Sequence, residues 1–428
     1  MSAVRRPLRL PLFVVLLLST VSCTPRDDSV VLRFWAMGRE GEVVSELLPG
    51  FEAEHPGVRV EVQQIPWSAA HEKMLTAFVG RSTPDVAQLG NTWIAEFAEL
   101  GAIAPLDERI AASKSLADSS FFSGILETNR IDGATFGVPW YVDTRVVFYR
   151  RDFLAATGRP FPETWDDWRD TLVALRPHVS ADGFPVFLPL TEWSQPVILG
   201  LQAGSPLLGD GDTRGAFAAP AFRRALDFYA SLFREGLSPA VGYAEVGNIY
   251  QEFARGKFAM WITGPWNLGE MARRLPPELA DAWGTAPLPG PTGAASGVSL
   301  AGGSSLVVFA GSAHPEIAWE LVEYLARPEQ QARFYRLTGD LPAHRDAWAD
   351  STLRADPNVA AFETQLYRVA PTPKVPEWES IASRVQQRVE EIVRGGRDEG
   401  EALQDLDRDA DRLLEKRRWL RTHTEPAS

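Results

Sequence analysis

The sequence predicts an open α/β fold with a mostly parallel sheet, and three observations support this prediction. Short apolar runs rich in β-branched and aromatic residues recur at 30–35, 58–65 and 85–89, as expected of buried strands. The intervening segments 42–54 and 68–78 repeat apolar residues at helical spacing. Strands and helices that alternate at this spacing imply parallel strands with crossover helices, and they place a ligand crevice at the carboxyl ends of the strands.

The elements that follow are predicted by the same criteria. Residues 142–149 are strand-like, and a helix is expected to start at Thr164, a good N-cap that is followed by Asp166 and Asp167 near the positive end of the helix dipole. Pro56-Gly57 ends the helix predicted at 42–54. The remaining predicted elements are helices over 222–233, 249–253, 318–325 and 402–413, and a strand over 305–309.

Composition excludes several classes of protein. The 428 residues are 45% hydrophobic and 23% charged, which is typical of a soluble globular protein of two to three domains and excludes disordered, collagen-like and polytopic membrane chains. The net charge of −13, with no compensating basic block, argues against nucleic acid as a partner. Because the chain has a single cysteine, it has no internal disulfide, thiolate zinc cluster or iron–sulfur site.

That cysteine, Cys23, ends a segment with the pattern of a secretory signal. Residues 1–22 carry three arginines and then an apolar run of about 12 residues, too short to cross a ~30 Å hydrocarbon core. The small residues before Cys23 resemble the lipobox of bacterial lipoproteins, with Thr20 where Leu is more usual. We therefore expect lipidation of Cys23 and a membrane anchor of covalent lipid, with 23–29 as the lipidated N-terminus and linker. A plain signal peptide is the alternative.

A search for catalytic motifs favours no enzyme class. The chain has no phosphate-binding loop, no GxSxG elbow and no His-Glu-x-x-His zinc motif, and its six histidines are scattered. We expect no cofactor and no metal. A pair of glycosidase carboxylates leaves no fixed spacing in sequence, so a lipid-anchored glycan hydrolase remains the enzymatic alternative.

The 14 tryptophans suggest a second kind of site. Several lie beside Pro, Gly or Asp in predicted loops, where they are available for stacking as well as for packing. A sugar ring has an apolar CH face and polar hydroxyl edges, so carbohydrate sites combine flat aromatic rings with carboxylates, amides and Arg.

A series of segments occurs in a fixed order along nearly the whole chain after residue 30. They are FW (34–35), FEAEHPGV (51–58), PDV (84–86), WIAEF (93–97), GVPWYVDTR (137–145), FYRRD (148–152), PETW (162–165), FARGKFAM (253–260), GPW (264–266), GGS (302–304) and AWE (318–320). In order and spacing this series resembles the extracellular solute-binding proteins, family 1, of bacterial ABC importers, of the maltose/trehalose-binding type.

The resemblance implies a two-lobed periplasmic-binding-protein fold (type II), in which each lobe is an open sheet flanked by helices and the ligand lies between the lobes. Hinge crossings are expected near 141–143, 297–302 and 326–329. Lobe 1 then comprises 30–141 with 300–326, and lobe 2 comprises 144–298 with 329–428.

The resemblance also implies ligand-binding residues. Tyr141 and Asp143 match a pair near the hinge, Trp266 matches a stacking aromatic, and Gly302-Gly303 matches a close backbone approach to the ligand. Asn91 stands where the family often has an acidic sugar ligand, and Ser304 where relatives carry Trp. Further cleft candidates are Trp35, Trp67, Glu192, Trp193 and Arg345.

The function implied is capture of a sugar, a disaccharide or short oligosaccharide, and its delivery to ABC permease subunits, with no bond made or broken. The protein is expected to be a monomer, exported and anchored through Cys23, facing the periplasm or the cell exterior. A polyol phosphate such as glycerol-3-phosphate is the alternative ligand, with Arg145 or Arg345 binding the phosphate.

Overall fold

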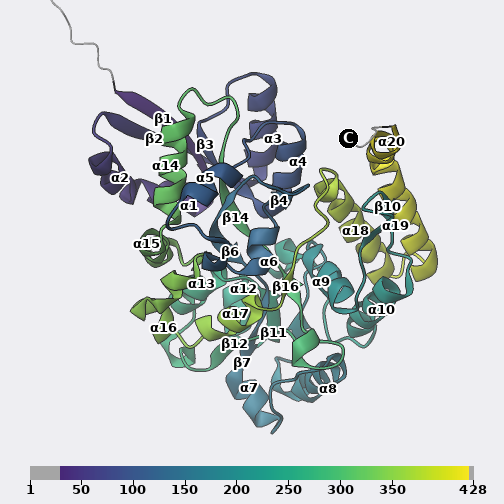
Figure 1. Cartoon of the computed structure of the whole chain (residues 1–428). Helices are drawn as coiled ribbons and strands as arrows, with labels where there is room; N and C mark the ends of the chain where they lie inside the picture. The colour runs from purple at the N-terminus through teal and green to yellow at the C-terminus, as the bar shows by residue number, and fades with distance from the viewer. Residues whose placement is uncertain (1–28, 424–428) are drawn as a thin grey trace, which may run out of the picture.

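The fold is built on two mixed β-sheets, which the computed structural model describes within residues 29–423 (Figure 1). The predicted signal segment 1–22 and the expected lipidation site Cys23 lie outside the described residues. Among the described residues, no helix has both the length and the apolar character needed to cross a bilayer.

The larger sheet has six strands in the order β15-β6-β14-β3-β1-β2. The predicted parallel arrangement is confirmed for β1 (Val30–Met37), which pairs in parallel with both β2 (Val58–Ile65) and β3 (Val86–Gly90). β14 (Gly302–Val308) then enters antiparallel between β3 and β6 (Val138–Asp143). The short β15 (Leu341–Pro342) closes the edge beside β6.

The smaller sheet has four strands in the order β12-β7-β11-β8. β7 (Val146–Arg150) is antiparallel to both of its neighbours, β12 (Trp283–Ala286) and β11 (Phe258–Thr263), while β8 (Phe184–Phe187) is parallel to β11. The single strand predicted over 142–149 is therefore wrong. The chain leaves the larger sheet after Asp143 and enters the smaller one at Val146, so that Thr144 and Arg145 connect the two.

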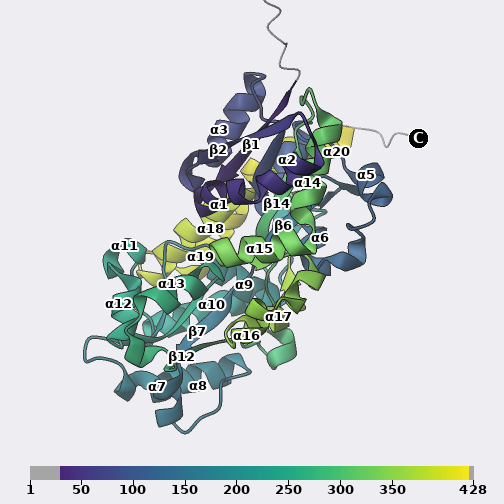
Figure 2. The same ribbon diagram turned by 90° about the vertical axis from the view of Figure 1, so that its left-hand side faces the viewer.

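The helices surround the two sheets, and α15 lies between the two parts of the molecule in Figure 2. They are α1 (Gly38–Val43), α2 (Leu48–Glu54), α3 (Trp67–Val79), α4 (Ile94–Glu99), α5 (Asp107–Ala112), α6 (Ser123–Glu127), α7 (Arg151–Ala156), α8 (Trp165–Leu175), α9 (Ser194–Gln202), α10 (Pro220–Arg234), α11 (Tyr243–Val246), α12 (Ile249–Ala254), α13 (Trp266–Arg274), α14 (Pro315–Ala326), α15 (Pro328–Thr338), α16 (Ser351–Ala355), α17 (Val359–Leu366), α18 (Trp378–Val393), α19 (Glu399–Leu413) and α20 (Glu415–His423). Short strand pairs complete the fold: β4 (Arg130–Ile131) with β5 (Ala134–Thr135), β9 (Leu208–Gly209) with β10 (Arg214–Gly215), and β13 (Ser299–Leu300) with β16 (Val369–Ala370).

Two helix predictions have instructive outcomes. Thr164 is the N-cap of α8, and its Oγ1 accepts a hydrogen bond of 3.0 Å from the backbone N of Asp167. The helix predicted over 42–54 is instead divided into α1, a 3₁₀ turn at Val44–Glu46, and α2. Pro49 lies in the first turn of α2, where its missing N–H is tolerated; in the middle of a continuous helix it would remove a hydrogen bond.

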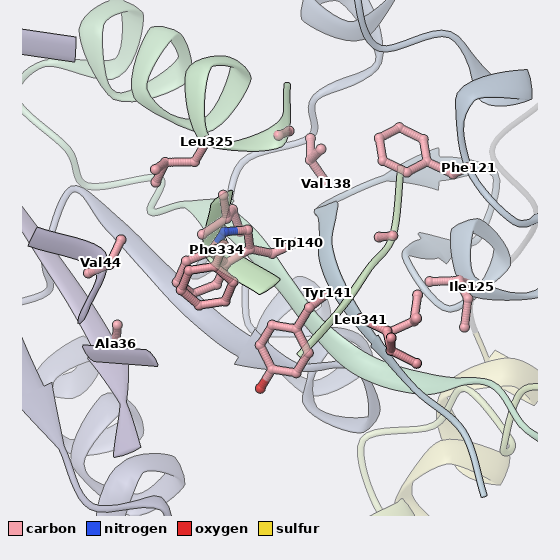
Figure 3. Close-up of a cluster of buried hydrophobic side chains, with 14 of the residues drawn as sticks. Ala36, Val44, Phe121, Ile125, Val138, Trp140, Tyr141, Leu325, Phe334 and Leu341 are labelled. Carbon is pink, nitrogen blue, oxygen red and sulfur yellow. The ribbon is translucent and has the colours of Figure 1, made fainter. Parts of the chain in front are cut away.

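The hydrophobic core around the larger sheet includes β6 and α15. Trp140 stacks on Phe334 with ring centroids 4.3 Å apart, and Tyr141 lies next to them with its hydroxyl pointing away from the aliphatic side chains (Figure 3). This packing joins α15 to the first predicted lobe, and β15 extends the same sheet, although the prediction placed 329–428 in the other lobe.

Two glycines determine how closely β14 approaches β6. A Cβ at Gly302 would lie 2.5 Å from the carbonyl O of Asp143, and a Cβ at Gly303 would lie 2.3 Å from the carbonyl O of Tyr141. Gly303 also has a φ of +128°, a region that L side chains rarely adopt. The strand pairing itself therefore requires the glycines that we expected to serve a close approach of ligand.

We predict that Gly303→Ala destabilises the fold by about 1–3 kcal/mol more than Gly293→Ala does, because only the first adds a backbone clash. Gly293 is a matched control with a φ of +138° and no atom within 4 Å of its built Cβ. Urea unfolding followed by circular dichroism measures both. Equal losses for the two variants would contradict the steric explanation.

Candidate functional site

A cavity of about 860 Å³ lies where the two sheets face each other. One side is formed at the carboxyl ends of the parallel strands of the larger sheet, with Glu40 after β1, Trp67 after β2 and Asn91 after β3. The other side includes Trp266, which follows β11, and Trp193, in the loop between β8 and α9. The lining residues are Arg39, Glu40, Trp67, Gly90, Asn91, Thr92, Trp93, Tyr141, Asp143, Arg145, Trp193, Trp266, Gly269, Glu270, Arg273, Leu300, Ala301, Gly302, Gly303, Leu337, Thr338, Asp340 and Thr372.

Arg145 organises the side of the cavity nearest the crossing between the sheets. Its guanidinium forms an ion pair with Asp143 and lies over the Trp266 ring, 4.5 Å from the centroid. Gly264 makes room for this indole, since a Cβ there would lie 1.9 Å from a ring carbon of Trp266. Side chains from both ends of the crossing thus form one surface with charged and aromatic faces.

A buried hydrogen-bond network holds Glu40 and Tyr141 in place. Tyr141 donates its hydroxyl hydrogen to Glu40 Oε1 at 2.7 Å, and the same hydroxyl oxygen accepts hydrogen bonds from Gln88 Nε2 at 2.9 Å and Ser304 Oγ at 3.0 Å. Glu40 is only 7% exposed, yet it lines the cavity. Within residues 29–423 the hydrogen bonds that the Glu40 side chain accepts all reach Oε1, so Oε2 is left to accept one from a ligand.

Two carboxyl groups of the cavity, those of Asp340 and Asp143, have raised pKa values. Burial raises the pKa of Asp340 well above its usual range, and the nearby Glu40 and Asp143 carboxylates raise it further. Burial also raises the pKa of Asp143, although the Arg145 guanidinium opposes this shift. The same two causes, burial and the charge of Glu40, raise the pKa of Tyr141. The cavity therefore presents hydrogen-bond donors and acceptors in a partly dehydrated setting.

Two tryptophans offer open faces to the cavity from opposite sides. Trp67 and Trp266 are each 40% exposed, which is unusual for so large an apolar side chain. Trp93 supports Trp67 in an edge-to-face contact with centroids 5.8 Å apart. Together with the charged groups, these rings form the combination that carbohydrate recognition requires.

Asn91 is held by the neighbouring strand. Its Oδ1 accepts a hydrogen bond of 3.1 Å from Ser305 Oγ, while its Nδ2 is buried without a partner. An unpaired buried donor costs about 1–3 kcal/mol, which a ligand or water acceptor in the cavity would recover.

Eight of the predicted ligand-binding residues line this cavity, namely Trp67, Asn91, Tyr141, Asp143, Trp193, Trp266, Gly302 and Gly303. Three do not. Trp35 is buried in a hydrophobic cluster under α3, because its side chain leaves β1 away from the cavity. Glu192 does not line the cavity and accepts a hydrogen bond of 3.1 Å from Ser194 Oγ. Arg345 lies beside Tyr367 in a separate depression.

Sequence reasoning missed several polar residues of the cavity. Arg39 and Glu40 directly follow β1, so the rule that ligands bind at the carboxyl ends of strands pointed to them. Glu270 and Arg273 lie one and two helical turns into α13, next to the predicted Trp266. No local sequence pattern pointed to Asp340, because it enters the cavity through the turn that follows α15. Within residues 29–423, no group of three or more His, Cys, Asp or Glu side chains is arranged to hold a metal ion.

We predict that Asp340→Asn changes how stability depends on pH. An acid whose pKa is raised by folding contributes stability below its unfolded pKa of about 3.9, and this contribution is lost as the pH rises through the native pKa. The free energy of unfolding of the wild type relative to Asp340→Asn should therefore fall as the pH rises above about 4. Denaturant unfolding across the pH range measures the difference.

Asp182→Asn is the control for this experiment, because the hydrogen bond from Lys257 lowers the pKa of Asp182. The stability that Asp182 contributes is lost as the pH falls, so its curve should slope in the opposite direction. The same slope for both variants would contradict the burial of Asp340.

Comparison with known proteins identifies related chains. Residues 37–332 match the family described as bacterial extracellular solute-binding protein. A putative binding protein of Brucella abortus is 25% identical over 88% of this chain and 91% of its own length, and the diacetylchitobiose binding protein DasA of Streptomyces coelicolor is 26% identical over 79% of this chain and 78% of its own.

Solved structures of related proteins resemble this chain. The sugar-binding protein MalE of Xanthomonas citri is 44% identical, with a TM-score of 0.89 over 92% of this chain and 100% of that one. The acarbose-binding receptor GacH of Streptomyces glaucescens shares the fold at 23% identity, with a TM-score of 0.77 over 90% of this chain and 99% of its own. Two of these relatives are named as a sugar-binding protein and a diacetylchitobiose binding protein. The two sheets with a cavity between them are thus a two-lobed periplasmic-binding-protein fold, and the chain belongs to the bacterial extracellular solute-binding protein family.

Proposed function

We propose that this protein is the extracytoplasmic sugar-binding lipoprotein of an ABC importer and that it captures a disaccharide or short oligosaccharide in the cavity between its two sheets. The observation that carries the proposal is the pair of half-exposed indoles, Trp67 and Trp266, contributed from opposite sides of a cavity that also presents carboxylates and Arg145. The printed names of relatives, among them a sugar-binding protein and a diacetylchitobiose binding protein, support the same ligand class.

The proposed mechanism is capture by closure. The sugar binds to one lobe, recruits the other by bending at the crossings near residues 141–145 and 297–302, and is delivered in the closed form to a membrane permease. No covalent bond changes. Closure requires contacts that are made only in the closed form, since a ligand shifts an equilibrium only by its differential affinity for the two states. In this proposal the protein is exported as a monomer and Cys23 carries the lipid anchor.

The contacts proposed for the sugar follow from the cavity. Trp67 and Trp266 stack on pyranose faces, while Asp143 and Glu40 accept hydrogen bonds from hydroxyl groups and Asn91 donates one. A polyol phosphate remains the alternative ligand. It would use Arg145, whose guanidinium already has the Asp143 carboxylate as a partner, so that a phosphate would compete with that ion pair.

We predict saturable binding of at least one sugar from a panel of maltose, trehalose and maltotriose, measured by intrinsic tryptophan fluorescence and by calorimetry. Trp266→Ala and Asp143→Ala should each weaken binding about tenfold or more, equivalent to about 1.4 kcal/mol. Trp419→Ala is the matched control, because Trp419 is exposed on α20 and does not line the cavity.

The same titrations separate the alternatives. Chromatography after incubation should recover the sugar intact, whereas cleavage that disappears with one carboxylate substitution would establish a hydrolase. Binding of glycerol-3-phosphate in place of the sugars, lost in Arg145→Met, would replace the proposed ligand class with a polyol phosphate. Absence of any binding would reject both ligand classes.

A further inference from the structure

Two polar contacts connect the larger-sheet part with the C-terminal helices of the other part. The hydroxyl group of Thr92, just after β3, donates a hydrogen bond to the carboxylate of Glu379 in α18. Glu99, at the end of α4, forms an ion pair of 3.0 Å with Arg417 in α20. These contacts join residues 287 and 318 positions apart in the chain.

The elements that carry these contacts belong to different hydrophobic clusters. Ile94 and Phe97 of α4 pack with β1 and β3, whereas Ile381 and Val385 of α18 pack with α10 and α19. The two sheets share a third apolar cluster, but within the described residues no cluster includes both α4 and α18, so at this edge the four polar side chains connect parts that pack separately. A contact of this kind can break without unfolding either body.

Arg417 is placed to reach from one body to the other. The helix that carries it is fixed to its own part by Arg418, which donates hydrogen bonds to the carbonyl oxygens of Thr213 at 2.7 Å and Asp411 at 2.6 Å. The Arg417 side chain is only 11% exposed, and its Nε is buried without a hydrogen-bond partner. Its charge also acts on Glu377, a carboxyl whose pKa burial raises. Breaking the ion pair would therefore leave the largely buried Arg417 guanidinium without the Glu99 carboxylate that pairs with it.

The other contact reaches the cavity directly. Thr92 lines the cavity between Asn91 and Trp93, and its hydroxyl group is held by Glu379 from the far part. Separation of the two parts would break this hydrogen bond. The contact therefore links the cavity wall at Thr92 to the distance between the two parts.

We infer that Thr92, Glu99, Glu379 and Arg417 form a cross-part latch that stabilises the closed arrangement and slows the release of bound sugar. This inference rests on the proposed function, since it takes closure of the two lobes as the motion that is controlled. Glu379, Glu99 and Arg417 act as positioning residues: they stabilise the closed wall of the cavity and do not themselves line it.

The test compares Arg417→Gln, Glu99→Gln and the double variant with the wild type. Arg418→Gln is the matched control, one residue away on the same helix, whose contacts stay within its own part. Small-angle X-ray scattering measures the radius of gyration without ligand and with saturating maltose, and stopped-flow fluorescence measures the rate of maltose dissociation.

We expect Arg417→Gln and Glu99→Gln each to increase the radius of gyration or to accelerate maltose dissociation by about five- to thirtyfold. The double variant should be no more affected than either single one, because both remove the same pair. Glu99→Gln, at a half-exposed residue, keeps the test decisive if Arg417→Gln lowers the melting temperature. Glu379→Ala should have an effect of the same direction.

Unchanged radii and dissociation rates in these variants, or an equal effect of Arg418→Gln, would overturn the latch. If the wild type binds no maltose, the unliganded scattering alone decides: a larger radius in Arg417→Gln and Glu99→Gln, but not in Arg418→Gln, supports the latch, and unchanged radii reject it. The sugar panel described above tests the proposed ligand class separately, so the two failures are distinguishable.

Discussion

The close pairing of β14 with β6 is the constraint on which the rest of the site depends. Gly302 and Gly303 allow the backbone of β14 to lie directly against the carbonyls of Asp143 and Tyr141. At this point the chain crosses between the two sheets twice, from the larger to the smaller through Thr144-Arg145 and back to the larger through the segment that precedes β14. Because both crossings are brought together here, Tyr141, Asp143, Arg145 and Ala301 converge on one end of the cavity without any need for long loops to position them.

The electrostatics of the cavity follow from that placement. Asp143 and Arg145 neutralise each other at the crossing, whereas Glu40 is held by hydrogen bonds from Tyr141 and Gln88 and forms no ion pair with the part of the chain that the structure describes. Asp340 accepts a hydrogen bond from the Thr338 side chain, which lowers its pKa, but burial outweighs this and favours its protonated form. Charges of this kind are tolerated in a partly dehydrated site only where hydrogen-bonding groups compensate them. A ligand that carries many hydroxyl groups supplies such compensation at several positions at once.

The sequence was most informative where local chemistry decides the structure. The strands at 58–65 and 86–90 and the Thr164 cap follow from short-range patterns, whereas Asn91 and Trp266 came from the family resemblance. The split of 142–149 into two strands was not predictable, because both halves are equally apolar and only the tertiary arrangement assigns them to different sheets. The prediction that Trp35 lies in the cleft failed for a related reason: a strand alternates its faces, and residues alone do not say which face meets the cavity.

Residues brought in from a distance were beyond the reach of local patterns. Asp340 enters the cavity because α15 packs against β6 through Phe334 and Trp140. These two residues are 194 positions apart in the sequence, so no local periodicity predicts their contact. Arg345 was expected at the cleft, and the same packing carries it past the cavity to a different surface. The family resemblance supplied the architecture, while the particular set of polar groups depends on how helices of this chain pack.

If the proposed closure is a two-state change, the energies involved explain why it would need a sugar. Moving a two-state equilibrium from 1:99 to 99:1 takes about 5.5 kcal/mol. An ion pair with one half-exposed partner, such as Glu99–Arg417, contributes up to about 1 kcal/mol, and a hydrogen bond to a charged group such as Glu379 about 1.5–3 kcal/mol. These contacts alone fall short of that requirement. The remainder must come from a ligand that touches Trp67 on one side and Trp266 on the other. In the proposed mechanism neither contribution suffices by itself, so closure would depend on the sugar and reverse when the sugar is withdrawn, which is the behaviour that delivery to a permease requires.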